Sequence, residues 1–134
     1  MKQGIQTNFP HEVLRKYGCY FFCLAEWASR VSKKEFTEND LINFFDKARD
    51  AELIRKDCTI LNPPQILNLM VGIDVFSMSR ITTKPPIYKT YIIYLEKPYY
   101  GHFILCDDRV MWDPLDPERP GAAGYTPISY REIA

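Results

Sequence analysis

Cys19 follows Gly18 directly and stands at the start of an apolar segment with helical spacing. A helix N-terminus offers unpaired backbone N–H groups and the positive end of the helix dipole, and both favour ionisation of a thiol to the reactive thiolate. The stretch therefore predicts a cysteine nucleophile. Cysteine is also among the most often buried residue types, so the same stretch taken alone fits an ordinary core cysteine.

A histidine and a carboxylate come together in the pattern of residues 101–114. Two short β-type runs, 102–106 and 110–112, flank the acidic turn 107–109 and predict a β-hairpin. His102 opens the first strand and Asp113 closes the second, so antiparallel pairing makes them neighbours. With the imidazole facing the start of the helix, Cys19, His102 and Asp113 supply a nucleophile, a general base and a group that orients the base.

These blocks resemble papain-like cysteine peptidases, and most closely the small C39-like branch. The resemblance lies in Gly18-Cys19 entering a helix and in Gly101-His102-Phe103-Ile104-Leu105 followed by Trp112-Asp113-Pro114. It implies a papain-like fold, with Cys19 as nucleophile, His102 as general base and Asp113 as the residue that orients the imidazole. Residues 17–21, YGCYF, are also similar to a block shared by small uncharacterised proteins of phages and other mobile elements.

The oxyanion position departs from the pattern of that family, which places a glutamine a few residues before the nucleophile. Val13 stands at about this place, and the nearest upstream glutamines are Gln6 and Gln3. Gln6 fits the role if residues 7–15 form an insertion that loops out. Loss of one oxyanion donor typically slows a reaction about a hundredfold to a thousandfold, so a degenerate descendant that only binds is the alternative.

Composition predicts one domain, residues 1–134, because this length with 46% hydrophobic residues provides a single core. Lys+Arg and Asp+Glu both number 17, so the one-sided basic character of a phosphate-backbone binder is missing. We therefore expect no nucleic acid as primary partner. Neither a leader segment nor a bilayer-spanning stretch is visible, which predicts a soluble cytoplasmic protein without a membrane partner, in the host cytoplasm if a phage encodes it.

No pair of cysteines has the Cys-x-x-Cys spacing of zinc and redox sites, so neither a metal nor another cofactor is predicted. Reduced thiols are expected. Cys23 and Cys58 are interpreted as buried structural residues. His11, the other histidine, is interpreted as a solvated side chain among charged neighbours and not as the base.

Helical signals come first and strand signals follow. Helices are predicted over residues 8–17, 20–31, 37–48 and 62–71, and strands over 73–78, 91–95 and the hairpin. Loops are expected at 84–86, 96–98 and 113–124, the last near the site, and residues 128–133 predict an edge strand or a short helical turn. The order predicts an α+β domain in which N-terminal helices pack on a C-terminal antiparallel β-sheet.

The predicted function is hydrolysis of a peptide or isopeptide-type amide through a Cys-His-Asp triad, with a protein or peptide as substrate. Transamidation and deamidation would use the same residues. Tyr99 and Tyr100 precede His102 and are expected to line a substrate groove together with Gly18, although tyrosines are common in strands for packing reasons. The alternative is a papain-like fold reused as a phage-borne binding or inhibitory, anti-defence protein.

Overall fold

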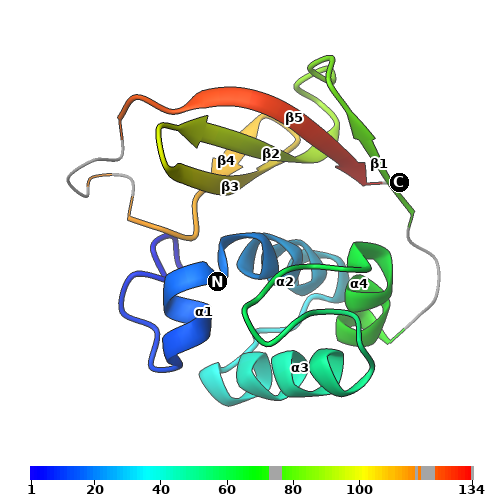
Figure 1. Cartoon of the computed structure of the whole chain (residues 1–134). Coiled ribbons are helices and arrows are strands. Elements are labelled where there is room, and N and C mark those ends of the chain that lie inside the picture. The colour runs from blue at the N-terminus through cyan, green and yellow to red at the C-terminus, as the bar shows by residue number, and fades with distance from the viewer. Residues whose placement is uncertain (73–76, 117, 119–122, 134) are drawn as a thin grey trace.

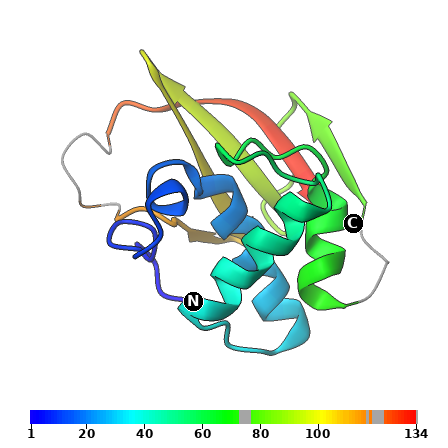
Figure 2. The same cartoon turned by 60° about the horizontal axis from the view of Figure 1, so that its bottom comes forward.

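The computed structural model, which describes residues 1–72, 77–116, 118 and 123–133, has a helical layer on one face of an antiparallel sheet (Figure 1 and Figure 2). This arrangement confirms the predicted α+β class. The helices are α1 (Glu12–Tyr17), α2 (Cys19–Ser32), α3 (Glu38–Asp50) and α4 (Pro63–Val71), and the strands are β1 (Met78–Ile81), β2 (Thr90–Lys97), β3 (Tyr100–Asp107), β4 (Val110–Trp112) and β5 (Thr126–Ile133).

The strands lie in the order β1-β5-β2-β3-β4, and every neighbouring pair is antiparallel. The predicted hairpin is β3 and β4, which are joined through Asp108 and Arg109. Both turn residues have the positive φ that a tight hairpin needs, 44° and 72°. The hairpin therefore forms where the sequence pattern indicates it.

Three predicted strand boundaries need correction. The predicted loop 96–98 is strand as far as Lys97, because the ladder continues through the pair Lys97↔Tyr100. The last segment is neither an edge strand nor a helical turn: β5 lies inside the sheet, between β1 and β2. Of the strand predicted over 73–78, residues 73–76 lie outside the described ones, and β1 begins at Met78.

The helix ends follow capping chemistry, with one correction. Thr37 caps α3 in a capping box with Asp40, as the sequence predicts. Helix α1, however, begins at Glu12, and its cap is His11, whose Nδ1 accepts a hydrogen bond from the Leu14 N–H at 3.3 Å. The His11 ring also packs edge-on against Phe45, with centroids 5.2 Å apart. His11 is therefore a structural cap and not merely a solvated side chain.

Helix α2 is the centre of the hydrophobic core. It is buried along most of its length and contacts both α4 and β3. The sheet contributes Ile92, Leu105 and Trp112 to this core, while Tyr91 and Cys106 belong to a second apolar cluster on the other face of the sheet. The predicted burial of Cys23 and Cys58 is confirmed. In the described part of the chain, no helix has the length and apolar character needed to cross a bilayer.

A chain of charged groups links α2 to the β3–β4 hairpin. The Met1 ammonium and Glu26 form a buried ion pair at 2.7 Å, and Glu26 also accepts from Arg30 Nε at 3.2 Å. Arg30 Nη1 in turn pairs with Asp107 at 3.1 Å. Asp107 accepts a hydrogen bond from the Thr90 hydroxyl at 2.9 Å, so the network extends from the helical layer into β2.

Gly18 joins α1 to α2 at a very close backbone approach. A Cβ at this position would lie 2.4 Å from the carbonyl oxygen of Leu14. We expect Gly18→Ala to lower the free energy of unfolding by about 1–3 kcal/mol, because a carbonyl in a helix cannot move aside without breaking its hydrogen bonds.

Chemical denaturation followed by circular dichroism measures this loss. Gly101→Ala is the comparison variant, because the nearest atoms to its Cβ belong to the Tyr94 side chain, from 2.7 Å, and not to the backbone, so we expect a smaller loss of stability than in Gly18→Ala. Equal stability of Gly18→Ala and the wild type would contradict the assigned role of Gly18.

Candidate active site

Cys19 is the first residue of α2, and Gly18 immediately before it caps both helices through its backbone. No side chain caps this helix start, so its N–H groups remain available to the thiol. Burial raises the pKa of the Cys19 thiol to about 11, although hydrogen bonds from the N–H groups of Phe103, Tyr20 and Cys19 itself act in the opposite direction. The expected easy ionisation is therefore not found: at neutral pH the resting thiol is protonated.

His102 and Asp113 form the neighbouring pair that the hairpin predicts. His102 Nε2 lies 2.7 Å from Asp113 Oδ1, and the histidine side chain is only 3% exposed. The same Oδ1 accepts the N–H of Leu115 at 2.9 Å, which fixes the carboxylate. A carboxylate only accepts hydrogen bonds, so the hydrogen of the neutral imidazole resides on Nε2 and Nδ1 presents a lone pair.

The thiol lies at the free edge of β3. Strand β4 pairs only with residues Leu105–Asp107, and at Phe103 the N–H of β3 is directed to the Cys19 sulfur instead of to another strand. Because side chains alternate along a strand, His102 and Phe103 flank this edge from opposite faces of the sheet. Phe103 packs with the helix-side core, whereas Ile104 and Cys106 belong to the cluster on the other face, so His102 lies on the face of the sheet away from the helices. The expectation that its imidazole faces the helix start is therefore not met, and any contact with the thiol has to be made around the strand edge.

His102 Nδ1 is buried, and no group in the described residues forms a hydrogen bond with it. A buried acceptor without a partner is unfavourable in a folded protein. In this resting state the thiol is held by the N–H of Phe103, one residue from the unused lone pair. The residue that carries the unused lone pair is therefore the chain neighbour of the residue whose N–H reaches the thiol.

The N-terminal segment holds the loop that carries Asp113. Gly4 N–H donates to the carbonyl of Asp113 at 3.0 Å, and Gln6 N–H donates to the carbonyl of Pro114 at 2.8 Å. Trp112 Nε1 donates to the carbonyl of Met1 at 3.1 Å. These contacts form a backbone strap over residues 112–114 that limits where the carboxylate can move.

Gln6, the candidate oxyanion donor, is buried inside this strap. Its Nε2 donates to the carbonyl of Arg15 at 3.0 Å, and its Oε1 has no hydrogen-bond partner in the described residues. Residues 7–15 between it and the nucleophile contain turns and the first part of α1. One amide hydrogen of Gln6 is thereby held by α1 and not offered to Cys19.

The predicted substrate-binding residues lie at two different places. Tyr99 is 100% and Tyr100 63% exposed at the tip of the β2–β3 hairpin. With Tyr94, Glu96 and Lys97 they line a hollow of about 360 Å³ that also includes Gly101, the residue before His102. Gly18 lies beside the thiol, but its contact with Leu14 already accounts for a glycine there.

Sequence reasoning missed an aromatic cluster beside the thiol. Tyr20 stacks on Phe103 with centroids 4.3 Å apart, and Tyr94 lies against Phe103 at 4.9 Å. The guanidinium of Arg131 lies within 6 Å of all three rings. Tyr20 follows Cys19 and Phe103 follows His102 in the chain, so the sequence could have indicated these two aromatic residues as part of the site. Arg131 could not be found in this way, because only the position of β5 inside the sheet brings it to the cluster.

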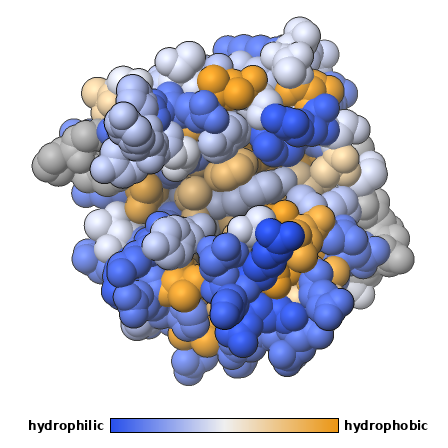
Figure 3. All heavy atoms as spheres, in the orientation of Figure 1, coloured by the Kyte–Doolittle hydropathy of each residue, from blue (hydrophilic) through white to orange (hydrophobic). Residues whose placement is uncertain are grey.

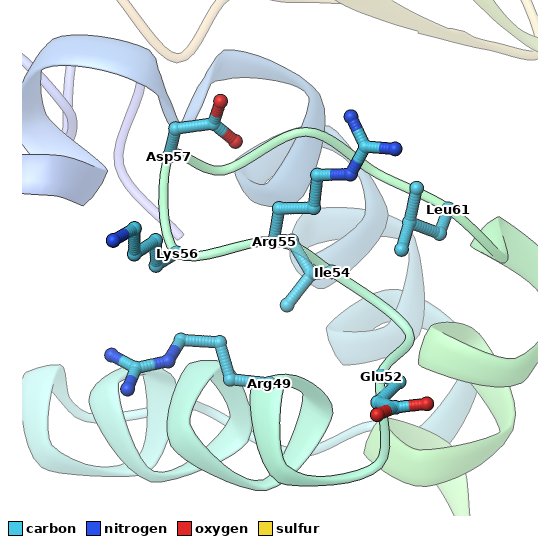
Figure 4. Close-up of a pocket in the computed structure, with 7 residues that line it drawn as sticks. All are labelled: Arg49, Glu52, Ile54, Arg55, Lys56, Asp57 and Leu61. Carbon is cyan, nitrogen blue, oxygen red and sulfur yellow. The ribbon is translucent and has the colours of Figure 1, made fainter.

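The face seen in Figure 3 is hollowed between the sheet and the helices; side chains of intermediate hydropathy line the hollow, and hydrophilic side chains with scattered hydrophobic ones lie on both sides of it. A separate hollow of about 530 Å³ lies between α3 and the loop that follows it (Figure 4). It is lined by Arg49, Glu52, Ile54, Arg55, Lys56, Asp57 and Leu61, and contains no member of the candidate triad.

Within the described ranges, no group of three or more His, Cys, Asp or Glu side chains is arranged to hold a metal ion.

Comparison with protein-family models matches residues 1–126 to the family described as "Protein of unknown function, DUF261". No curated protein and no solved structure matches the chain.

The environments of the cysteines predict an order of reactivity. Cys19 is half-buried, whereas Cys23, Cys58 and Cys106 are buried. Burial also raises the pKa of Cys58, to about 12, above that of Cys19. We expect limiting iodoacetamide at pH 7.5 to label Cys19 first, as peptide mapping by mass spectrometry would show. Faster labelling of a buried cysteine in the folded protein would contradict this order.

Removal of the proton acceptor should change the pH dependence of the Cys19 reaction. In His102→Ala, the thiol has only its raised pKa of about 11, so the alkylation rate should increase about tenfold per pH unit between pH 7 and 10. In the wild type, transfer of the proton to Nδ1 should give a flatter profile and a higher rate at pH 7. Identical profiles for the two proteins would show that His102 does not assist the thiol.

The hydrogen bond to Asp113 predicts the tautomer of His102. Nitrogen-15 NMR of the neutral imidazole should show the hydrogen on Nε2, because Asp113 Oδ1 accepts it at 2.7 Å. Asp113→Asn should lose this preference, since the amide of asparagine both donates and accepts. A neutral His102 with its hydrogen on Nδ1 in the wild type would rule out the proposed base.

Proposed function

We propose that this chain, which belongs to the DUF261 family of proteins of unknown function, is a thiol hydrolase of peptide or isopeptide-type amides. The proposal extends the resemblance to papain-like peptidases of the C39-like branch. The observation that carries it is the buried, unused Nδ1 of His102, whose Nε2 is held by Asp113 and whose neighbour Phe103 holds the Cys19 thiol. A buried acceptor without a hydrogen-bond partner, next in the chain to the residue that reaches the thiol, supports a role for His102 in proton transfer.

In the first half of the reaction, Cys19 is the nucleophile. When the thiol turns from the Phe103 N–H to Nδ1, its proton passes to Nδ1 and the sulfur attacks the substrate carbonyl carbon. The negative charge that develops on the carbonyl oxygen is stabilised by the N–H of Cys19 at the uncapped start of α2. The C–N bond then breaks, Nδ1–H protonates the departing amine, and a thioester to Cys19 remains.

In the second half, a water molecule replaces the amine. His102 Nδ1 takes a proton from the water as the oxygen attacks the thioester carbon, and the C–S bond breaks to release the acid and the thiol. Asp113 stabilises the imidazolium in both halves because its Oδ1 stays on Nε2. Transamidation would use an amine in place of water at this step.

The raised pKa of Cys19 gives this mechanism a protonated resting state. A thiol that is protonated at neutral pH resists oxidation and adventitious alkylation. Exclusion of water by a substrate would strengthen the interaction between thiolate and imidazolium. The cytoplasm, where thiols stay reduced, is the proposed setting, and all four cysteines are free in the structure.

A binding or inhibitory protein is the second candidate function. Two observations favour it: one amide hydrogen of Gln6 is engaged by Arg15, and burial raises the Cys19 pKa. Its contact residues would be the exposed Tyr99 and Tyr100, since interface energy concentrates on such aromatic side chains. In a phage or mobile element, such a protein would act on a host protein.

The deciding experiment is turnover of a mixed pool of internally quenched peptides and isopeptides by the wild type and by Cys19→Ala. Cys19→Ala should abolish cleavage while the protein keeps its melting temperature within a few degrees, because a thiol at a helix start makes few packing contacts. His102→Ala should be about as damaging, since residues that act as one unit do not contribute additively.

Tyr88→Ala is the control, because Tyr88 is an exposed tyrosine outside both the proton-transfer chain and the hollow at the β2–β3 tip. It should retain turnover, with at most a change in KM. Cleavage that survives in Cys19→Ala would overturn the proposal, and a wild type without any Cys19-dependent product would favour the binding protein.

A further inference from the structure

Arg131 is a charged residue on the face of the sheet that the helices cover. Its cross-strand partner on β2 is Ile92, which belongs to the main hydrophobic core. Partners directly opposite each other in an antiparallel pair share a face, so Arg131 points to the helical side. Arginine is rarely placed on such a face without a specific reason.

The described residues give the charge of Arg131 no acidic partner. Among the described residues it forms no ion pair; its Nη1 donates to Ser129 Oγ at 2.6 Å, and its guanidinium lies over the rings of Phe103, Tyr94 and Tyr20 at 5.2, 5.5 and 5.8 Å. Its cross-strand neighbour on β1 is another cation, Arg80. Burial lowers the pKa of the guanidinium, a hydrogen bond to the Tyr20 hydroxyl acts in the opposite direction, and the charge of Arg80 lowers the pKa again.

The same three rings connect Arg131 to the candidate nucleophile. Tyr20 follows Cys19 in the chain, and the backbone of Phe103 donates to its sulfur. Tyr94 also lines the hollow of about 360 Å³ at the β2–β3 tip. Tyr94 therefore belongs both to this hollow, which Glu96 and Lys97 also line, and to the rings under the guanidinium, so a substrate chain in the hollow would meet the aromatic cluster at Tyr94.

We propose that Arg131 binds a carboxylate of the substrate and thereby selects acidic peptides. The inference rests on the function proposed above and specifies its substrate class. The aromatic rings hold the guanidinium in place without neutralising it, and the pair with Arg80 makes this a local positive site in a protein of zero net charge. A carboxylate would replace the missing ion-pair partner with charge-assisted hydrogen bonds.

The test compares alkylation of Cys19 by iodoacetate, an anion, and by iodoacetamide, its neutral analogue. Arg131→Gln should lower the ratio of the iodoacetate rate to the iodoacetamide rate about tenfold, the usual size of one lost hydrogen bond to a charged group. Arg131→Lys should keep most of the ratio because the charge remains. Arg49→Gln removes the same charge from the separate hollow on α3 and should leave the ratio unchanged.

Competition on the wild type distinguishes the source of the carboxylate and does not depend on the folding of any variant. A peptide with an internal Glu and an amidated C-terminus should protect Cys19 from iodoacetamide better than its Gln counterpart. Protection by the Gln peptide only when its C-terminus is free would assign the carboxylate to a chain end instead of a side chain, and would contradict selection of acidic side chains.

The outcomes separate the two proposals. If iodoacetamide labels Cys19 but Arg131→Gln leaves the ratio unchanged, or Glu and Gln peptides protect equally, the carboxylate site is wrong and the hydrolase proposal is untouched. If neither reagent labels Cys19 in the folded wild type, the nucleophile assignment fails, and the substrate class that rests on it fails as well.

Discussion

The 2.7 Å hydrogen bond between His102 and Asp113 is the contact on which the candidate site depends. It fixes the tautomer of the imidazole, and it requires two segments eleven residues apart to meet in a defined register. That register is set by the β3–β4 pairing, and the loop beyond it is held by the backbone strap of residues 1–7. Removal of the strap would leave the carboxylate on the connection between β4 and β5 without the hydrogen bonds from Gly4 and Gln6 that hold it.

Local signals explain why much of this arrangement is predictable from sequence. The capping box of Thr37, the turn 107–109 and the glycine before Cys19 act within a few residues of the structure that they determine. The juxtaposition of His102 and Asp113 is predictable for the same reason, because a hairpin has one short connection. The α+β class is predictable because the helical patterns come first along the chain and the strand patterns follow.

Other features depend on contacts between distant segments, and the sequence pattern does not contain them. Strand β5 lies between β1 and β2, but the local sequence of β5 fits other strand orders equally well. The observed order places Arg131 over the ring of Phe103. The engagement of Gln6 by Arg15 depends on how the strap folds back. The raised pKa of Cys19 is likewise a tertiary effect, since burial outweighs the helix start that the sequence reveals.

The length of the Asp108–Arg109 turn has a consequence for how the family can diversify. The register of β3 is fixed by its pairing with β2, so a one-residue change in the length of this turn would shift β4 against β3 and carry Asp113 to the face opposite His102. Single-residue insertions or deletions in this turn would then leave a folded sheet with a dismantled site. Relatives that keep the chemistry should therefore vary this turn by substitution, and change its length in steps of two residues.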